Sequence, residues 1–344
     1  MMLWHGALSD ALGRRPIVLG SLAIFALATL GCAIAGNIES RWLFRALQGL
    51  SAGAGLVVGR AIIRDRFDGA EAQRLMSQIT LVFGIAPAVA PVLGGLLLTI
   101  FGWRSLFWAL LGLTLALLAW AAKALPETLP REARHTLHPR ALWRSYRSVL
   151  SRIDFLLLAL IPALNFCALF LYIASAPAFL IDLLGVSSLG FALLFIPMIL
   201  GIMAGASISG RLAGRTSPKR TVRLGYAMMA TGVAVNLATC WLVEPGVPWN
   251  VLPIMVFTLG SSLAAPSITL LMLDLSPGVR GMASSLQGFV QFALSGIVAS
   301  TVAPFLSHSV GALALGMTGF TVAGLALWLV YQRRAQTHLK GWHS

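Results

Sequence analysis

The chain has 344 residues, of which 58% are hydrophobic and only 10% are charged. A soluble globular domain carries about a quarter of charged residues, so this composition argues strongly against one. The formal net charge is +14. That value leaves a nucleic-acid-binding protein or a membrane protein with basic loops, and the positions of the charges decide between these classes.

Ten apolar runs follow one another along the chain, each long enough to cross a bilayer, which takes about 20 helical residues. They cover residues 17–36, 42–63, 77–101, 105–125, 155–181, 188–210, 222–243, 247–273, 282–306 and 311–331. Each run must form a helix, because lipid offers no other partner for backbone N–H and C=O groups. The sequence therefore predicts an all-α membrane protein with ten transmembrane helices.

The basic residues alternate between the two sides of these predicted helices. All lysines and arginines except Arg41, Arg45 and Arg104 fall in or beside alternate connections, or in the two ends of the chain. Short basic loops stay on the cytoplasmic side of a membrane. We therefore expect a multi-pass protein with both termini in the cytoplasm, and the basic loops explain the charge without nucleic acid.

The longest connection is polar and basic and covers residues 126–154. It follows four predicted spans in residues 1–125 and precedes six in residues 155–332, after which a tail covers residues 333–344. Parallel-repeat transporters join two six-helix halves by a loop of this kind, so we expect the N-terminal half to lack two helices. The apolar stretch 1–8 reaches only about 12 Å as a helix and cannot supply one.

The three cysteines show no paired or metal-ligand spacing. Cys32, Cys167 and Cys240 each lie inside an apolar run, where a cysteine behaves as a small hydrophobic residue. We therefore expect neither a disulfide framework nor a metal site.

Several short segments carry a resemblance to a known family. The loop GALSDALGRRP at residues 6–16 resembles the signature loop between the second and third helices of the major facilitator superfamily. RALQG at residues 45–49 resembles the fourth-helix motif of that superfamily. GIAPAVAPVLGG at residues 84–95 resembles its fifth-helix antiporter motif, in the double-proline form of the Bcr/CflA branch of drug exporters. Segments 102–104, 126–129 and 280–288 are similar to that branch as well.

The resemblance implies a major facilitator fold in which the ten spans are helices three to twelve of twelve. It implies proton-coupled antiport of small amphipathic drugs across the bacterial inner membrane by alternating access. The expected transporter is a monomer whose partners are the drug, protons and the lipid bilayer, and it uses the proton gradient and no cofactor. A carrier for a nutrient or metabolite and a truncated remnant that no longer transports remain as alternatives. An enzyme is disfavoured, because no catalytic constellation appears.

The first motif supplies five candidates for gating: Gly6, Asp10, Gly13, Arg14 and Arg15. The glycines allow a tight turn and a close approach of helices. Asp10 can accept hydrogen bonds from backbone N–H groups at a helix start or from an arginine. Such a cluster can latch the transporter in one state and release it in another. The alternative is a basic loop that only sets the topology.

The third predicted span carries a second set of gating candidates: Gly84, Pro87, Pro91, Gly94 and Gly95. Offsets of three and four place these residues on one helical face with little side chain. Small residues at such spacing let two helices approach closely. The resemblance implies an interface that prevents leak during the transport cycle, and generic packing is the alternative.

Arg45 and Gln48 form a polar patch one helical turn apart near the start of the second predicted span. An arginine inside a membrane is costly and usually faces a cavity or a partner, so Arg45 can tune the pKa of a carboxylate or orient the substrate. It can instead extend to the membrane surface through its long stem. No carboxylate lies deep inside a predicted span, and the resemblance implies that the titrating group lies on the first helix of the complete fold.

A drug cavity is mostly apolar and aromatic, with a few polar groups. The candidates to line it are Phe83, Asn165, Phe166, Tyr172, Asn236, Gln287 and Gln291. Asn165 and Tyr172 lie seven residues apart, two turns along one helical face. The polar candidates can equally form hydrogen bonds between neighbouring helices.

Overall fold

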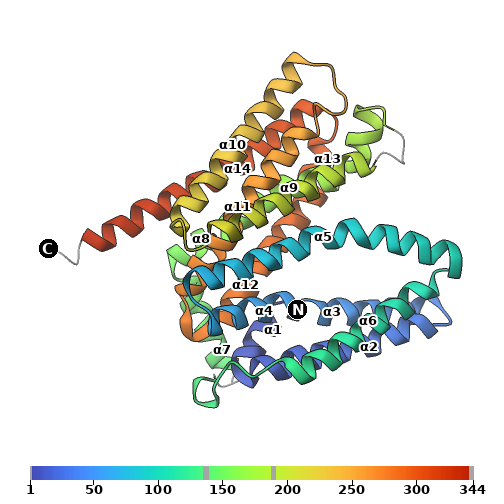
Figure 1. The fold of residues 1–344 in the computed structure, drawn as a ribbon, viewed down its shortest axis with the longest axis vertical. Helices are drawn as coiled ribbons and strands as arrows, with labels where there is room; N and C mark the ends of the chain where they lie inside the picture. The colour runs from blue at the N-terminus through green and yellow to red at the C-terminus, as the bar shows by residue number, and fades with distance from the viewer. Residues whose placement is uncertain (1, 135–138, 187–190, 341–344) are drawn as a thin grey trace. The chain divides into compact units, whose positions relative to one another are not determined.

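The computed structural model describes residues 2–134, 139–186 and 191–340 (Figure 1). The chain forms two compact units, each built from segments that lie apart in the sequence. Unit 1 comprises Met1–Phe67, Val89–Val149 and Ser276–Gly288, and unit 2 comprises Asp68–Ala88, Leu150–Leu275 and Phe289–Ser344. Helices α5 (Gly69–Phe101) and α12 (Arg280–Ile297) therefore each contribute one segment to both units.

Unit 1 is held together by the packing of α2 against both α3 and α6. Apart from its parts of α5 and α12, its helices are α1 (Met2–Leu12), α2 (Arg14–Ile34), α3 (Ile38–Ala52), α4 (Ala54–Arg66), α6 (Arg104–Ala124) and α7 (Pro139–Leu150). Asn37 begins α3, because its side-chain oxygen accepts from the N–H of Ser40 at 2.8 Å and satisfies a free donor of the first turn. Gly53 separates α3 from α4.

Unit 2 is built around α11, which packs against α9 and α10, while α14 packs against α8. Its remaining helices are α8 (Ile153–Ala174), α9 (Phe191–Leu212), α10 (Pro218–Leu242), α11 (Leu252–Asp274), α13 (Ala303–Leu306) and α14 (Val310–Lys340). A Cβ atom added at Gly205 of α9 would lie 2.1 Å from the carbonyl oxygen of Leu259 in α11. One added at Gly225 of α10 would lie 2.6 Å from the carbonyl oxygen of Gly260. Glycine therefore permits the close approach of both helices to α11.

Nine stretches in the described part of the chain are long and apolar enough to span a membrane. They are Arg14–Ile34, Ile38–Arg66, Arg104–Ala124, Ile153–Ala174, Ala192–Leu212, Pro218–Leu242, Leu252–Asp274, Pro277–Leu306 and Val310–Gln336. They cover nine of the ten predicted spans, and the other, 77–101, lies within α5, whose side chains are described only in part. The predicted all-α membrane fold is confirmed, whereas the count of ten spans and the assignment to helices three to twelve stay predictions.

Two predicted spans are interrupted by π-helical turns. The predicted span 155–181 consists of α8 and, after Pro177, a π-helix over Ala178–Leu183. The predicted span 282–306 consists of α12, a π-helix over Val298–Val302 and α13. Pro177 and Pro304 lack the backbone N–H that an α-helix uses at those positions, and each lies within two residues of a π-helical turn.

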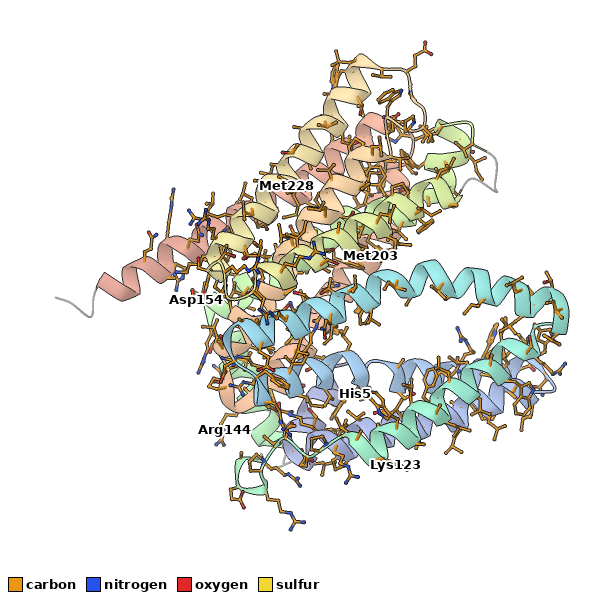
Figure 2. The ribbon with its side chains drawn as sticks, viewed as in Figure 1. His5, Lys123, Arg144, Asp154, Met203 and Met228 are labelled. Atoms are coloured by element: carbon orange, nitrogen blue, oxygen red, sulfur yellow. The ribbon has the colours of Figure 1, made fainter. Side chains whose placement is uncertain are left out.

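Large apolar side chains remain exposed on the surfaces of the spanning helices. Trp241 is 85% exposed and Phe305 is 75% exposed, and Met228 of α10 is another exposed example (Figure 2). Soluble monomers rarely expose large apolar patches. A bilayer covers such side chains, so their exposure agrees with the membrane fold.

Candidate functional site

Asp10 lies near the end of α1, and its side chain caps the N-terminus of a different helix, α12. Its Oδ1 accepts a hydrogen bond from the N–H of Gly281 at 3.1 Å, and its Oδ2 accepts one from the N–H of Met282 at 2.7 Å. These donors belong to the first turn of α12, which has no partners of its own for them and whose dipole favours a negative charge. Asp10 is only 1% exposed, so its carboxylate serves this helix start away from water.

Arg14 is the first residue of α2 and is equally buried, with 1% of its surface exposed. Its Nη1 donates to the carboxylate of Asp10 and to Oγ of Ser9, the latter at 2.8 Å. Its Nε donates to Oδ2 of Asp65 at 3.0 Å. A buried guanidinium without partners would cost several kcal/mol, and these two carboxylates allow Arg14 to lie inside the protein.

Asp65, near the end of α4, joins Arg14 to a second arginine. Its Oδ1 accepts from Nη1 of Arg280, the first residue of α12, at 3.0 Å. We call Asp10, Arg14, Asp65 and Arg280 the charge cluster. The signs alternate along it, and it connects α1, α2 and α4 to the start of α12 within unit 1. The cluster can therefore hold this helix start in place by paired charges.

Gly6 and Gly13 of the first motif stand at positions where a larger residue would be sterically unfavourable. A Cβ atom added at Gly6 would lie 2.2 Å from the carbonyl oxygen of Gly281, so α1 and α12 approach each other through backbone. Gly13 has φ 109°, a conformation that other residues rarely adopt, and it makes the turn between α1 and α2. Arg15 is exposed, and its Nη2 donates to the carbonyl oxygen of Ala122 at the end of α6, at 2.7 Å.

Glu127 lies in the loop that follows α6, and its side chain caps the N-terminus of α2. Its Oε1 accepts from the N–H groups of Arg14 at 2.9 Å, Thr128 at 2.9 Å and Leu129 at 3.0 Å. Partial burial acts to raise the pKa of this carboxyl, but the N–H groups of Leu129, Arg14, Thr128 and Arg15 together lower it below the ordinary value. Arg14 is thus held by carboxylates at both its side chain and its backbone.

Arg45 and Gln48 do come together, at the surface of unit 1. Arg45 is exposed, and its Nη1 donates to Oε1 of Gln48 at 3.1 Å. Gln48 is buried and donates from Nε2 to Oγ1 of Thr29 on α2 at 2.6 Å. Arg45 also borders a cleft of about 570 Å³ lined by Ile38, Arg41, Trp42, Leu106, Phe107 and Leu110. The geometry agrees with a role at a cleft and with extension toward the membrane surface, so both interpretations stay open.

The candidates on α5 differ in how closely other residues pack around them. Gly84 is buried, and a Cβ atom added there would lie 2.7 Å from Cγ2 of Ile202 on α9, so these two helices approach closely. Gly94 has room, because its added Cβ would meet only Cδ2 of Leu106, at 3.8 Å. Phe83 is 54% exposed. Pro87, Pro91 and Gly95 lie within the helix, and their side-chain surroundings are outside the described part.

Three polar cavity candidates of unit 2, together with Tyr226, form hydrogen bonds between helices. Oδ1 of Asn165 on α8 accepts from the hydroxyl of Tyr226 on α10 at 3.3 Å. Nδ2 of Asn236 on α10 donates to the hydroxyl of Tyr172 on α8 at 2.8 Å. All four side chains are buried. This is the geometry of hydrogen bonds between helices, the second of the two interpretations, and a role in a cavity stays a prediction.

Phe166 belongs to a more open aromatic group in unit 2, and Gln291 precedes one member of that group, Phe292. The ring of Phe166 stacks on Phe170 with centroids 5.7 Å apart and meets the edge of Phe292 at 6.3 Å. Phe292 is exposed, and Phe166 and Gln291 are half-buried. An aromatic group of this kind suits an apolar ligand.

Gln287 is bound by an arginine that the sequence did not single out. Nη1 of Arg60 on α4 donates to Oε1 of Gln287 on α12 at 3.1 Å, and Gln287 is buried. Arg60 lies inside the candidate span Ile38–Arg66. It was missed because it stands near the end of a predicted span, among arginines that set the topology. An arginine in a span usually faces a cavity or a partner.

Comparison with known families settles the identity of the fold. Residues 1–300 match the family described as the Major Facilitator Superfamily. The chain belongs to this superfamily. It is a multi-pass membrane protein, as the apolar helices require.

Relatives in the superfamily match most of the chain. The uncharacterized MFS-type transporter YdgK of Bacillus subtilis is 33% identical over 301 residues, 86% of this chain and 74% of that protein. Multidrug resistance protein D of Escherichia coli is 30% identical over 329 residues, 95% of this chain and 82% of that protein. The bicyclomycin resistance protein homolog of Haemophilus influenzae is 28% identical over 309 residues, 88% of this chain and 75% of that protein.

Solved structures of the superfamily share the fold. The human organic anion transporter MFSD10 aligns with a TM-score of 0.77 at 22% identity, covering 95% of this chain and 80% of that one. The Escherichia coli fucose:proton symporter FucP aligns with a TM-score of 0.76 at 11% identity, covering 96% of this chain and 87% of that one. At these identities the likeness establishes the fold alone.

Within this major facilitator chain, sequence reasoning found half of the charge cluster. Asp10 and Arg14 were predicted as site residues, whereas Asp65, Arg280 and the nearby Glu127 were not. Segments 126–129 and 280–288 were noticed for their resemblance, so a signal existed for Glu127 and Arg280. Asp65 stands between two other charged residues, where nothing local distinguishes it.

Proposed function

We propose that this chain is a multidrug exporter that exchanges small amphipathic drugs for protons across a bacterial inner membrane. Two relatives that are 28% and 30% identical over most of the chain carry the names bicyclomycin resistance protein homolog and multidrug resistance protein D. The exporter works by alternating access as a monomer, with both termini in the cytoplasm. Its partners are the drug, protons and lipid. The proton gradient supplies the energy, and no cofactor is used.

The charge cluster is the observation that carries the mechanism. Alternating access needs contacts that are made in one state and broken in another. A buried ion pair gives little net stability, because desolvation offsets most of the attraction, so it can hold one state without making the other inaccessible. The cluster binds the start of α12, and this helix continues into unit 2. Releasing that start is the switching step that we propose.

Arg45 is the proposed coupling or substrate residue. It is an exposed cation beside a cleft with apolar and aromatic walls. The buried Gln48–Thr29 hydrogen bond anchors its partner side chain. In this position the guanidinium either lowers the pKa of a carboxylate brought near it or binds an acceptor group of the drug.

The test is drug efflux by cells that lack their own exporters. Cells that make the chain are expected to accumulate less ethidium and to survive higher concentrations of several unrelated drugs than vector controls. A protonophore is expected to abolish the difference. Unchanged susceptibility across the panel, with the protein present in the membrane fraction, would refute drug export. Uptake of a sugar or amino acid in the same cells would instead identify a nutrient carrier.

A further inference from the structure

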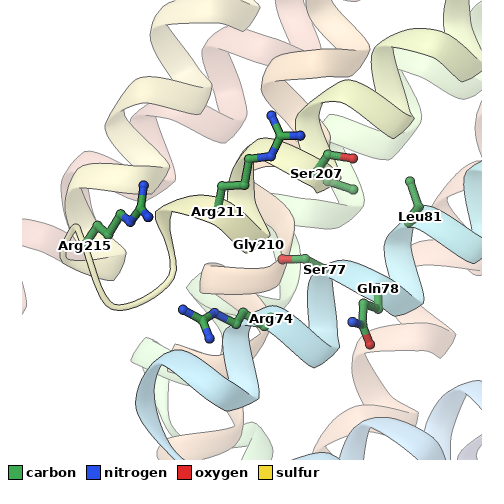
Figure 3. A pocket seen from close by; sticks show the side chains of 9 residues that line it. Arg74, Ser77, Gln78, Leu81, Ser207, Gly210, Arg211 and Arg215 are labelled. Carbon is green, nitrogen blue, oxygen red and sulfur yellow. The ribbon is translucent and has the colours of Figure 1, made fainter.

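A basic cleft of about 400 Å³ lies between α5 and α9 in unit 2 (Figure 3). Arg74, Ser77 and Gln78 line it from α5, and Ser207 and Arg211 line it from α9. Arg215 follows the end of α9 and lines the same cleft. Closer to the middle of α5, the approach of Gly84 to Ile202 brings the two helices together.

The arginines of this cleft form no ion pair with a carboxylate in the part of the chain that the structure describes. In the ranges that the structure describes, no carboxylate lies within 4.0 Å of the guanidinium of Arg74, Arg211 or Arg215. All three side chains are exposed. The charge cluster of unit 1 is different, because each of its arginines has a carboxylate partner. The cleft is therefore ready to accept an anion from outside.

The contacts around the cleft are arranged like those around the charge cluster: in each unit, the end of one helix bonds to the first turns of another. In unit 1 the end of α1 holds the start of α12 through Asp10. In unit 2 the end of α9 holds the first turns of α5, since Nε2 of Gln73 donates to the carbonyl oxygen of Ser209 at 3.3 Å. Gly214, with φ 79°, then passes close to Ala70 of α5. Among the described residues that line the second cleft, three are arginines and none carries a carboxylate.

The position of the arginines along the helices indicates the kind of anion. Arg211 lies in the last turn of the candidate span Ala192–Leu212, Arg215 just beyond it, and Arg74 just before the predicted span 77–101. The ends of membrane-spanning helices lie in the headgroup region of a bilayer, where the lipid phosphates are. Leu81 continues the cleft toward the apolar part of α5.

The guanidinium groups of the cleft and their position at the helix ends both favour a phospholipid as the ligand. Guanidinium groups bind phosphate through charge-assisted, often bidentate hydrogen bonds. Basic pockets between transmembrane helices bind the headgroups of anionic lipids. We propose that the cleft between α5 and α9 binds the phosphate group of an anionic phospholipid through Arg74, Arg211 and Arg215. Free phosphate would bind the same guanidinium groups, but it has no apolar part to contact the apolar side of the cleft.

The experiment measures lipid retention by the purified chain in detergent by native mass spectrometry. Phosphatidylglycerol is titrated, with phosphatidylcholine as the uncharged comparison and inorganic phosphate as the competitor. The double variant Arg74→Gln, Arg211→Gln is expected to bind phosphatidylglycerol at least tenfold more weakly, since each basic residue near anionic lipid contributes about 1 kcal/mol. The matched control, Arg220→Gln with Arg223→Gln, removes the same charge from exposed positions of α10 outside the cleft and is expected to bind like the parent.

Each result decides the proposal. Equal weakening in the cleft variant and the control would show a general attraction to the basic surface and overturn it. Displacement of phosphatidylglycerol by millimolar inorganic phosphate would identify a free-phosphate site and also overturn it. If the double variant is not recovered folded, Arg215→Gln alone replaces it, because this exposed side chain lies beyond the helix end and its loss is expected to weaken binding several-fold.

Discussion

Oδ2 of Asp10 accepts a hydrogen bond from the N–H of Met282 at 2.7 Å, although 272 positions of sequence separate the two residues. A carboxylate at the end of one helix thus completes the first turn of another. In the proposed transporter, this bond is made in the state described here and broken in the other. Its chemistry predicts what substitutions at Asp10 will do.

Asp10→Asn is expected to reduce efflux about tenfold, because a hydrogen bond to a charged group contributes roughly 1.5–3 kcal/mol and the amide keeps only a neutral acceptor. The amount of protein in the membrane fraction is expected to stay unchanged. The control is Asp182→Asn, which alters an exposed carboxylate. Parental efflux from Asp10→Asn would mean that the loop only sets topology.

Asp65→Asn is expected to destabilise the protein more than Arg280→Gln. Asp65 bonds both Arg14 and Arg280, and its side chain is 8% exposed, whereas that of Arg280 is 19% exposed. Removing the partner of a buried charge costs about 3 kcal/mol or more. Thermal unfolding of the two purified variants in one detergent gives the comparison. A smaller loss for Asp65→Asn would show that Arg14 is satisfied by Asp10 alone.

Glu127 is expected to give a pH-dependent contribution to stability. Its folded pKa is lowered below the ordinary 4.5, so the stabilisation is present above that value and is lost as the pH falls through the folded pKa. Glu127→Gln is therefore expected to lower the unfolding temperature by about 2 °C near pH 7. Unfolding scans at descending pH are expected to show the gap between parent and variant narrowing below pH 4.5. A constant gap would assign the effect to packing.

Arg45→Ala is expected to impair proton-coupled efflux more than Arg45→Lys. Lysine keeps a positive charge beside the cleft although it lacks the planar fork, and the proposed role needs the charge. The ratio of protonophore-sensitive efflux to protein amount measures the effect. If both variants match the parent, Arg45 merely extends to the membrane surface.

Gly6→Ala is expected to destabilise the protein by about 1–3 kcal/mol, as overpacking does. The added Cβ would lie 2.2 Å from the carbonyl oxygen of Gly281, and backbone cannot yield as a flexible side chain does. Gly20→Ala is the matched control in α2, where nothing lies within 4 Å of an added Cβ. That variant is expected to be neutral or slightly stabilising, since alanine favours helices over glycine by up to about 1 kcal/mol. Equal unfolding temperatures in both variants would contradict the close approach of α1 and α12.

The fold was predictable because one solvent, lipid, dictates it locally. Any run of about 20 apolar residues must become a helix there, so hydropathy alone located the nine candidate spans found in the described part of the chain. The interruption after Pro177 was less predictable, because proline in a span can also cause a simple kink.

The pairings of the candidate site were not predictable in the same way. Asp65 and Arg280 are 215 positions apart, and no local pattern records that they meet. The two-turn spacing of Asn165 and Tyr172 correctly put them on one helical face, but a sequence does not state whether that face meets a cavity or another helix. In the structure, side chains of Tyr226 and Asn236 on α10 reach this face and bond to Asn165 and Tyr172.

The bond between Asp10 and the start of α12 also bears on how the protein is made. A ribosome adds about 5–20 residues per second, and it delivers Gly281 and Met282 long after Asp10, because 271 and 272 positions separate them. Until then the carboxylate has Arg14 but none of its later backbone donors. Helix α1 therefore reaches its final set of contacts only after α12 has been made.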